Sequence, residues 1–225
     1  MRFWTRLRFV QRFLLLASLV TIGSGCGSQK IIHTPEAQST QVNREELRAL
    51  ANKVDSSLAQ GDLVNAQREA LTYRAQRGAD PNLLAEWRRK IWMISESWGP
   101  HDNSALAKRE IKSAVAARKK IYAHERKMSH EAFVKWLGKQ GATATEPLFS
   151  KVDVQDGSVQ LWVTNQQMPT LDFNMKTLAE INDAVVARCG CAGRTNVGTY
   201  DTGFPVYLVR LDPDTRQSQV IAMPR

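Results

Sequence analysis

The sequence contains none of the short motifs that mark the common classes of enzyme. It has no G-x-S-x-G nucleophile elbow, no Walker A loop, no dinucleotide-binding fingerprint and no His-Glu-x-x-His zinc motif. Histidine is scarce, and its four copies have no metal-ligand spacing among themselves: His33, His101, His124 and His130. We therefore expect a noncatalytic protein that needs no metal or other cofactor.

The N-terminal apolar stretch is too short to cross a bilayer as a helix, which takes about 20 residues. This stretch covers residues 13–22, and the preceding residues 1–12 are basic and contain no acid. A basic segment, a short apolar segment and then small residues are typical of a secretory signal. A retained N-terminal membrane anchor is the alternative interpretation.

Cysteine is also scarce, and the first of the three cysteines follows this segment directly. Gly23-Ser24-Gly25-Cys26 resembles a bacterial lipobox, with Gly23 where leucine is usual. The resemblance implies cleavage before Cys26 and lipidation of its sulfur, for example with palmitate. Gly27 in place of aspartate favours sorting to the outer membrane in bacteria that resemble the enteric group. The chain would then face the periplasm, held by acyl chains that each contribute about 0.8 kcal/mol per buried CH₂.

Acidic residues are outnumbered, and most of the imbalance is local. Residues 1–25 hold four arginines and no acid, so their removal lowers the formal charge from +9 to +5. Residues 108–127 alone hold eight cations and two glutamates, which is +6. A solvated helix face is one interpretation, and a site for an anionic partner is the other. The candidate residues for that site are Lys108, Arg109, Lys112, Arg118, Lys119 and Lys120.

Apolar residues at helical spacing predict a small antiparallel bundle in residues 43–146. Asn43 and Glu46 resemble a capping box at its start, after a flexible polar tether over residues 27–42. A fourth helix is expected over about 104–126 and a fifth from Ser129. The apolar positions of the first three helices are Leu47, Leu50, Val54 and Leu58, then Leu63, Ala66, Ala70 and Tyr73, then Leu84, Trp87, Ile91, Ile94 and Trp98.

The pattern changes in residues 147–225, which predict a small sheet. Strands are expected at Ser158–Thr164, Phe204–Leu211 and Gln217–Met223, with short additions near 150–154 and 195–200. A helix is expected from Asn174 to Arg188. The chain is therefore predicted to be an α+β protein, with a helical bundle followed by a mainly antiparallel sheet that one helix covers.

Cys189-Gly190-Cys191 is the most unusual local feature of the sequence. With Cys26 lipidated, Cys189 and Cys191 would be the only thiols in an oxidising compartment. Three uses remain open: a structural disulfide, redox chemistry, or a metal site completed by other ligands. The spacing matches no standard zinc or thioredoxin-like motif.

We expect an outer-membrane lipoprotein that acts as a binding component of a larger envelope assembly, such as a secretion or conjugation system. That expectation comes from architecture alone. A periplasmic thiol protein using Cys189 and Cys191 is one alternative, and a lipoprotein that binds peptidoglycan or lipopolysaccharide is another. Nucleic acid is not an expected partner, because no aromatic platform interleaves with the basic residues.

Overall fold

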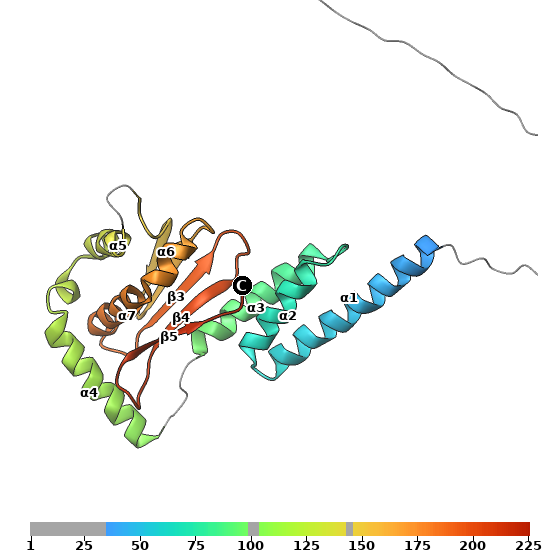
Figure 1. Cartoon of the computed structure of the whole chain (residues 1–225). Helices are drawn as coiled ribbons and strands as arrows, with labels where there is room; N and C mark the ends of the chain where they lie inside the picture. The colour runs from blue at the N-terminus through green and yellow to red at the C-terminus, as the bar shows by residue number, and fades with distance from the viewer. Residues whose placement is uncertain (1–34, 99–103, 143–145) are drawn as a thin grey trace, which may run out of the picture.

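The computed structural model describes residues 35–98, 104–142 and 146–225. In these ranges the chain forms seven α-helices, one 3₁₀ helix and five strands that make a single sheet (Figure 1). The predicted α+β class is therefore confirmed. The signal segment, Cys26 and residues 27–34 of the predicted tether lie outside the described residues.

Three helices form the N-terminal bundle: α1 (Pro35–Ala59), α2 (Leu63–Arg74) and α3 (Pro81–Ser97). Aspartates cap the N-termini of the second and third helices. The Asp62 carboxylate accepts from the Asn65 amide at 3.1 Å, and the Asp80 carboxylate accepts from the Asn82 amide at 2.8 Å. Each bond satisfies a helix N–H that has no partner within the helix. Turn residues 60–62 and 75–80 are short enough to fold the three helices side by side (Figure 1).

The predicted start of the first helix is wrong. Asn43 lies inside α1, which begins eight residues earlier at Pro35, so residues 35–42 are helical and not a flexible tether. The Asn43 side-chain amide donates to the carbonyl of Arg77 at 2.8 Å. Its role is therefore to link α1 to the turn after α2 and not to cap a helix.

The chain then passes to the opposite side of the molecule through α4 (Ala105–Ile121), a 3₁₀ turn η1 (Glu125–Lys127) and α5 (His130–Lys139). Hydroxyl groups cap both α-helices. Ser104 Oγ accepts from the Ala107 amide at 3.0 Å, and Ser129 Oγ accepts from the Ala132 amide at 3.2 Å. The fourth helix thus ends at Ile121, five residues before the predicted end, and the 3₁₀ turn replaces its last part.

The five strands lie in the order in which they occur along the chain. They are β1 (Lys151–Gln155), β2 (Ser158–Val163), β3 (Arg194–Thr199), β4 (Pro205–Leu211) and β5 (Ser218–Ala222). Three of the four pairings are antiparallel, and only β2 and β3 run parallel. Parallel neighbours need a crossover, which here consists of α6 (Met168–Phe173) and α7 (Met175–Cys189).

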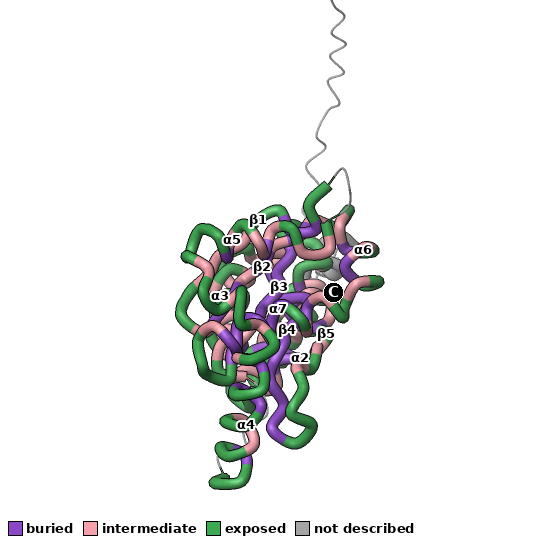
Figure 2. Tube along the Cα trace, turned by 90° about the vertical axis from the view of Figure 1, so that its left-hand side faces the viewer, coloured by how far each residue is buried: buried purple, intermediate pink, exposed green. Residues whose placement is uncertain are grey.

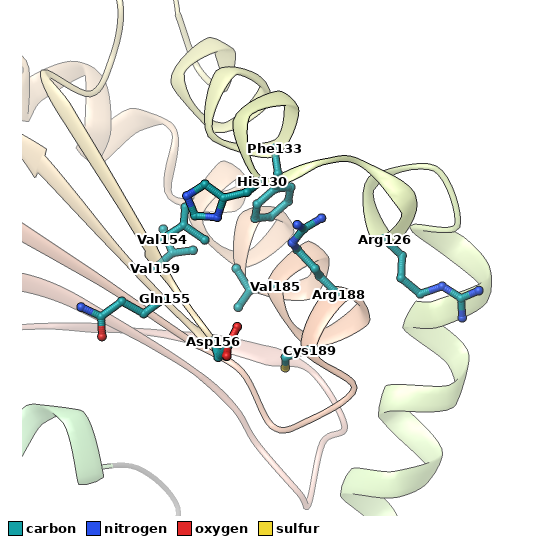
Figure 3. Close-up of a pocket in the computed structure, with 11 residues that line it drawn as sticks. Arg126, His130, Phe133, Val154, Gln155, Asp156, Val159, Val185, Arg188 and Cys189 are labelled. Carbon is teal, nitrogen blue, oxygen red and sulfur yellow. The ribbon is translucent and has the colours of Figure 1, made fainter.

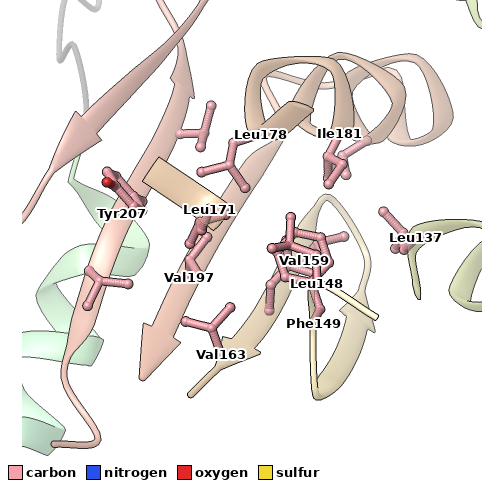
Figure 4. Packing of buried hydrophobic residues seen from close by; sticks show 14 of the residues in the cluster. Leu137, Leu148, Phe149, Val159, Val163, Leu171, Leu178, Ile181, Val197 and Tyr207 are labelled. Carbon is pink, nitrogen blue, oxygen red and sulfur yellow. The ribbon is translucent and has the colours of Figure 1, made fainter. Parts of the chain in front are cut away.

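Helices cover both faces of the sheet (Figures 1 and 2). On one face, Leu178 and Ile181 of α7 pack with Val159 and Val197 of the strands and with Leu137 of α5 (Figure 4). The other face packs against the bundle through a second set of buried residues. That set includes Val54, Leu63, Trp87, Ile91, Phe204, Leu208 and Met223. Each core therefore combines residues of the predicted helical region with residues of the predicted sheet region.

Arg210 on β4 fixes the end of α3 to the sheet. Its side chain is 4% exposed and donates to the carbonyls of Trp98 at 2.6 Å and Val209 at 2.8 Å, and to that of Ser95. The guanidinium thus supplies donors to two carbonyls at the C-terminus of α3, and the Ser95 carbonyl accepts from the Trp98 amide as well. Burial lowers the pKa of Arg210 to about 10, although Glu96 opposes the shift.

Candidate functional site

The basic segment forms the outer side of α4, and most of its cations face solvent. Lys108, Arg109, Lys112 and Lys120 are exposed, whereas Lys119 is half-buried. The helix runs along the edge of the molecule and projects from it at one end (Figure 2). Four of the six predicted residues therefore present their charge to solvent, on a helix that a partner could approach from outside.

Arg118 does not belong to that exposed set. It is 8% exposed, its Nε pairs with the Asp183 carboxylate of α7, and its Nη2 donates to the carbonyl of Arg216 at 2.9 Å. A guanidinium with these partners has little left to offer an external anion. The prediction that Arg118 binds a partner is therefore corrected: Arg118 holds α4 against α7 and against the turn between β4 and β5.

The inner side of α4 explains why the outer side is held in a fixed position. Small apolar residues, Ala114 and Val115, pack there against Val186 of α7 and Leu211 of β4. Glu110 adds an ion pair to Arg216. The exposed cations are thus mounted on a helix that is anchored by packing and by two ion pairs, and not on a free loop.

The two outer strands of the sheet differ in charge. β1 carries Lys151 and Asp153, whose side chains pair at 2.7 Å. β5, with the sequence Ser-Gln-Val-Ile-Ala, carries none. Natural proteins protect edge strands from pairing with other chains by placing charges on them, so β5 is the less protected edge.

The register shows which backbone groups β5 turns outward. The Asp212 amide donates to the Gln217 carbonyl at 2.9 Å, and the Met223 amide donates to the Val206 carbonyl at 3.0 Å. Because hydrogen-bonded pairs alternate along an antiparallel ladder, Gln219 and Ile221 also face β4. The outward N–H and C=O groups of β5 therefore belong to Ser218, Val220 and Ala222. This edge adjoins α4, since the Ser218 hydroxyl and Arg118 bind the same Asp183 carboxylate oxygen.

Cys189 and Cys191 form a disulfide with each other, with their Cα atoms 5.2 Å apart. The bond closes the C-terminus of α7, where Gly190 adopts a left-handed conformation with φ of 68°. Both cysteines are exposed. A three-residue loop gains roughly 1.6 kcal/mol from a disulfide in the chain-entropy treatment, against about 3 kcal/mol for a 15-residue loop. The bond is therefore a weak staple for the fold.

Close neighbours surround this disulfide on two sides. A Cβ on Gly190 would lie 2.7 Å from the Lys119 ammonium nitrogen, and a Cβ on Gly157 would lie 2.9 Å from Cys191 Sγ. The tip of the β1–β2 hairpin and the end of α4 thus both reach the cysteine loop. Within the described ranges, no group of three or more His, Cys, Asp and Glu side chains is placed to hold a metal.

A cavity of about 510 Å³ opens beside Cys189, between α5, α7 and the β1–β2 hairpin (Figure 3). Its polar lining comes from Arg126, His130, Gln155, Asp156, Arg188 and Cys189. Arg188 also donates to the Met128 carbonyl at 2.6 Å and lies over the ring of Phe133. These residues are scattered over some 60 positions of the chain, so no local motif could have indicated the cavity.

Trp92, which lies off the apolar stripe of its helix, is half-buried. Its ring packs against Trp162 with centroids 5.6 Å apart, and its indole N–H donates to the Gly203 carbonyl at 2.8 Å. It serves the junction of α3 with the sheet and is not part of an exposed contact surface.

No helix in the described part of the chain combines the length and the apolar character that a membrane crossing requires. Comparison with known proteins gave no match to a family model, to a curated protein sequence or to a solved structure. The functional argument therefore depends on the chemistry of the chain itself.

Proposed function

We propose that the chain is an outer-membrane lipoprotein, anchored through Cys26, that acts as a noncatalytic binding component of an envelope assembly. The lipobox-like sequence before Cys26 supports the anchoring. The uncharged edge of β5, whose first residue shares the Asp183 carboxylate with Arg118 of the cationic helix α4, is the single observation that carries the binding role. A partner protein would add a strand to β5, and α4 would attract acidic groups that flank that strand.

The two parts of this surface have different physical tasks. Strand addition gains affinity from main-chain hydrogen bonds to Ser218, Val220 and Ala222, and it needs no particular side chain on the partner. Exposed cations add little net affinity but accelerate encounter with an acidic surface, in a way that salt screens. Lys108, Arg109 and Lys112 would therefore control the rate of association, and β5 would control the lifetime of the complex.

The test of strand addition uses the full-length lipidated chain to capture partners from detergent-solubilised envelopes. Ala222→Pro removes one outward N–H without removing a hydrogen bond to β4, whereas Ala222→Ser keeps that N–H and is the matched control. We expect Ala222→Pro to reduce a stoichiometric partner at least tenfold and Ala222→Ser to leave it unchanged. Absence of any stoichiometric partner, or equal recovery with both variants, would contradict the proposal.

Replacing Lys108, Arg109 and Lys112 together by glutamine tests the role of α4. We expect slower association and a weaker dependence of the rate on salt, with an almost unchanged dissociation rate. Salt-dependent co-sedimentation with purified peptidoglycan or lipopolysaccharide, lost in the triple variant, would instead assign α4 to a cell-wall or lipid partner. Mass spectrometry of the mature chain tests the anchor, since an unmodified Cys26 is incompatible with it.

A further inference from the structure

The Cys189–Cys191 disulfide is placed where an external thiol can reach it. Both cysteines are exposed, and the adjoining cavity gives room for a peptide segment beside Cys189. Exposed disulfides are the labile ones, whereas structural disulfides resist exchange. So small a loop adds little to the stability of the fold. Stabilisation of the fold therefore does not explain why the bond is present.

The surroundings favour Cys189 as the sulfur that leaves. The Cys191 amide N–H points at Cys189 Sγ at 3.1 Å, and such a bond stabilises a thiolate. The Lys119 ammonium beside Gly190 and the Arg188 guanidinium on the cavity wall add positive charge. The carbonyl end of α7 opposes a negative charge at Cys189, and these donors offset it.

We propose that this disulfide oxidises a pair of thiols in a cysteine-containing protein of the envelope. A substrate thiolate attacks Cys191 Sγ, which forms a mixed disulfide and expels Cys189 as a thiolate. The second substrate thiolate then attacks the substrate sulfur of that mixed disulfide and releases Cys191. The substrate loses two electrons and two protons, and the cysteine pair gains both. This activity goes beyond the proposed binding role and does not need the β5 surface.

Gly157 positions the sulfur that is attacked. The β1–β2 hairpin reaches Cys191 only because residue 157 has no side chain, and Gly157 has φ of 73°. The Gly157 carbonyl also accepts from the Arg194 amide at 2.9 Å, which fixes the hairpin tip to the start of β3. Cys189 lines the cavity and Cys191 does not, so a substrate segment there would lie beside the leaving sulfur, and its thiolate would approach Cys191 from the exposed side of the loop.

The test measures exchange in the purified full-length chain with a synthetic peptide that carries two cysteines. The reference is a disulfide-bonded peptide of residues 188–192, which has the same loop without the surrounding structure. We expect one substrate disulfide per chain, formed at least tenfold faster than with the reference peptide. Lys119→Met should slow the reaction about threefold with unchanged thermal stability, and the Cys189→Ser, Cys191→Ser double variant should be inactive.

A peptide with a single cysteine tests the direction of attack, because it cannot resolve the mixed disulfide. Alkylation followed by mass spectrometry should find the peptide on Cys191 and the alkyl group on Cys189. A rate no greater than that of the reference peptide, or an adduct on Cys189, would overturn the proposal. Neither result bears on partner capture through β5, so the two proposals can fail separately.

Discussion

The cation on the inner side of α4 and the cations on its outer side have different roles. Arg118 on the inner side is buried and committed to Asp183 and to the Arg216 carbonyl. Lys108, Arg109 and Lys112 on the outer side are exposed. A count of cations along a sequence therefore does not measure a binding surface, because burial decides which charges remain available to a partner.

We expect the largest loss of stability from substitution of Arg210, which holds α3 against β4 as Arg118 holds α4 against α7. Arg210→Met would remove the guanidinium donors to the carbonyls of Ser95, Trp98 and Val209 and leave the Ser95 carbonyl with the Trp98 amide alone, at a cost of about 3 kcal/mol in the free energy of unfolding. Urea denaturation of the chain measures this cost. Arg210→Lys is the control, since it keeps the charge but loses the planar fork, and it should recover part of the stability. A loss below 1 kcal/mol in Arg210→Met would contradict the claim that buried cations stabilise this fold more than exposed cations do.

A direct comparison of the two sides of α4 should give a smaller effect. Arg118→Gln removes the charged partner of the Asp183 carboxylate and leaves it the Ser218 hydroxyl, and we expect a loss of about 2 kcal/mol in the free energy of unfolding. Lys112→Gln on the outer side should change it by less than about 0.5 kcal/mol. Both values come from the same denaturation series. Equal losses would show that packing, and not the ion pair, holds the helix.

Periodicity predicted most of the fold because it reports burial directly. The stripe from Leu84 to Ile94 and the alternation at Ser158–Thr164 each lie in an element of the expected kind. The helix start predicted at Asn43 was wrong because a capping pattern is local. The Asn43 side chain instead donates to the carbonyl of Arg77, 34 residues away. The sequence also could not indicate that α1–α3 cover the second face of the sheet. The same apolar stripe suits a free bundle and a bundle packed on a sheet.

The candidate site was predictable only in part. The basic run and the cysteine pair could be read from consecutive residues, and the structure pairs the cysteines. Arg118 faces inward because it pairs with Asp183, which lies 65 residues later in the chain. The basic run alone could not indicate this. The cavity combines residues from α5, α7 and a hairpin, so only the tertiary fold brings them together.

The smallest effect should come from Asp172, whose ion pair is intermediate between buried and exposed. The Arg225 guanidinium holds the pKa of this carboxyl below its usual value of 3.8, with Tyr207 as a second donor. Two bonds of 2.7 and 2.8 Å join Arg225 to Asp172, but both side chains are about 40% exposed. Solvent screening therefore keeps the contribution small.

The sign of its pH dependence follows from the lowered pKa. Stability from this pair is fully present above pH 3.8 and is lost as the pH falls through the lower folded value. Asp172→Asn should therefore lower the melting temperature slightly at pH 6 and reduce its fall below pH 3.8. Asp214→Asn, at the exposed tip of the β4–β5 turn, is the control. It should leave the melting temperature at pH 6 and its fall below pH 3.8 unchanged. If Asp172→Asn instead costs as much as Arg118→Gln, half-exposed pairs hold this fold as strongly as buried ones, and burial no longer separates the two sides of α4.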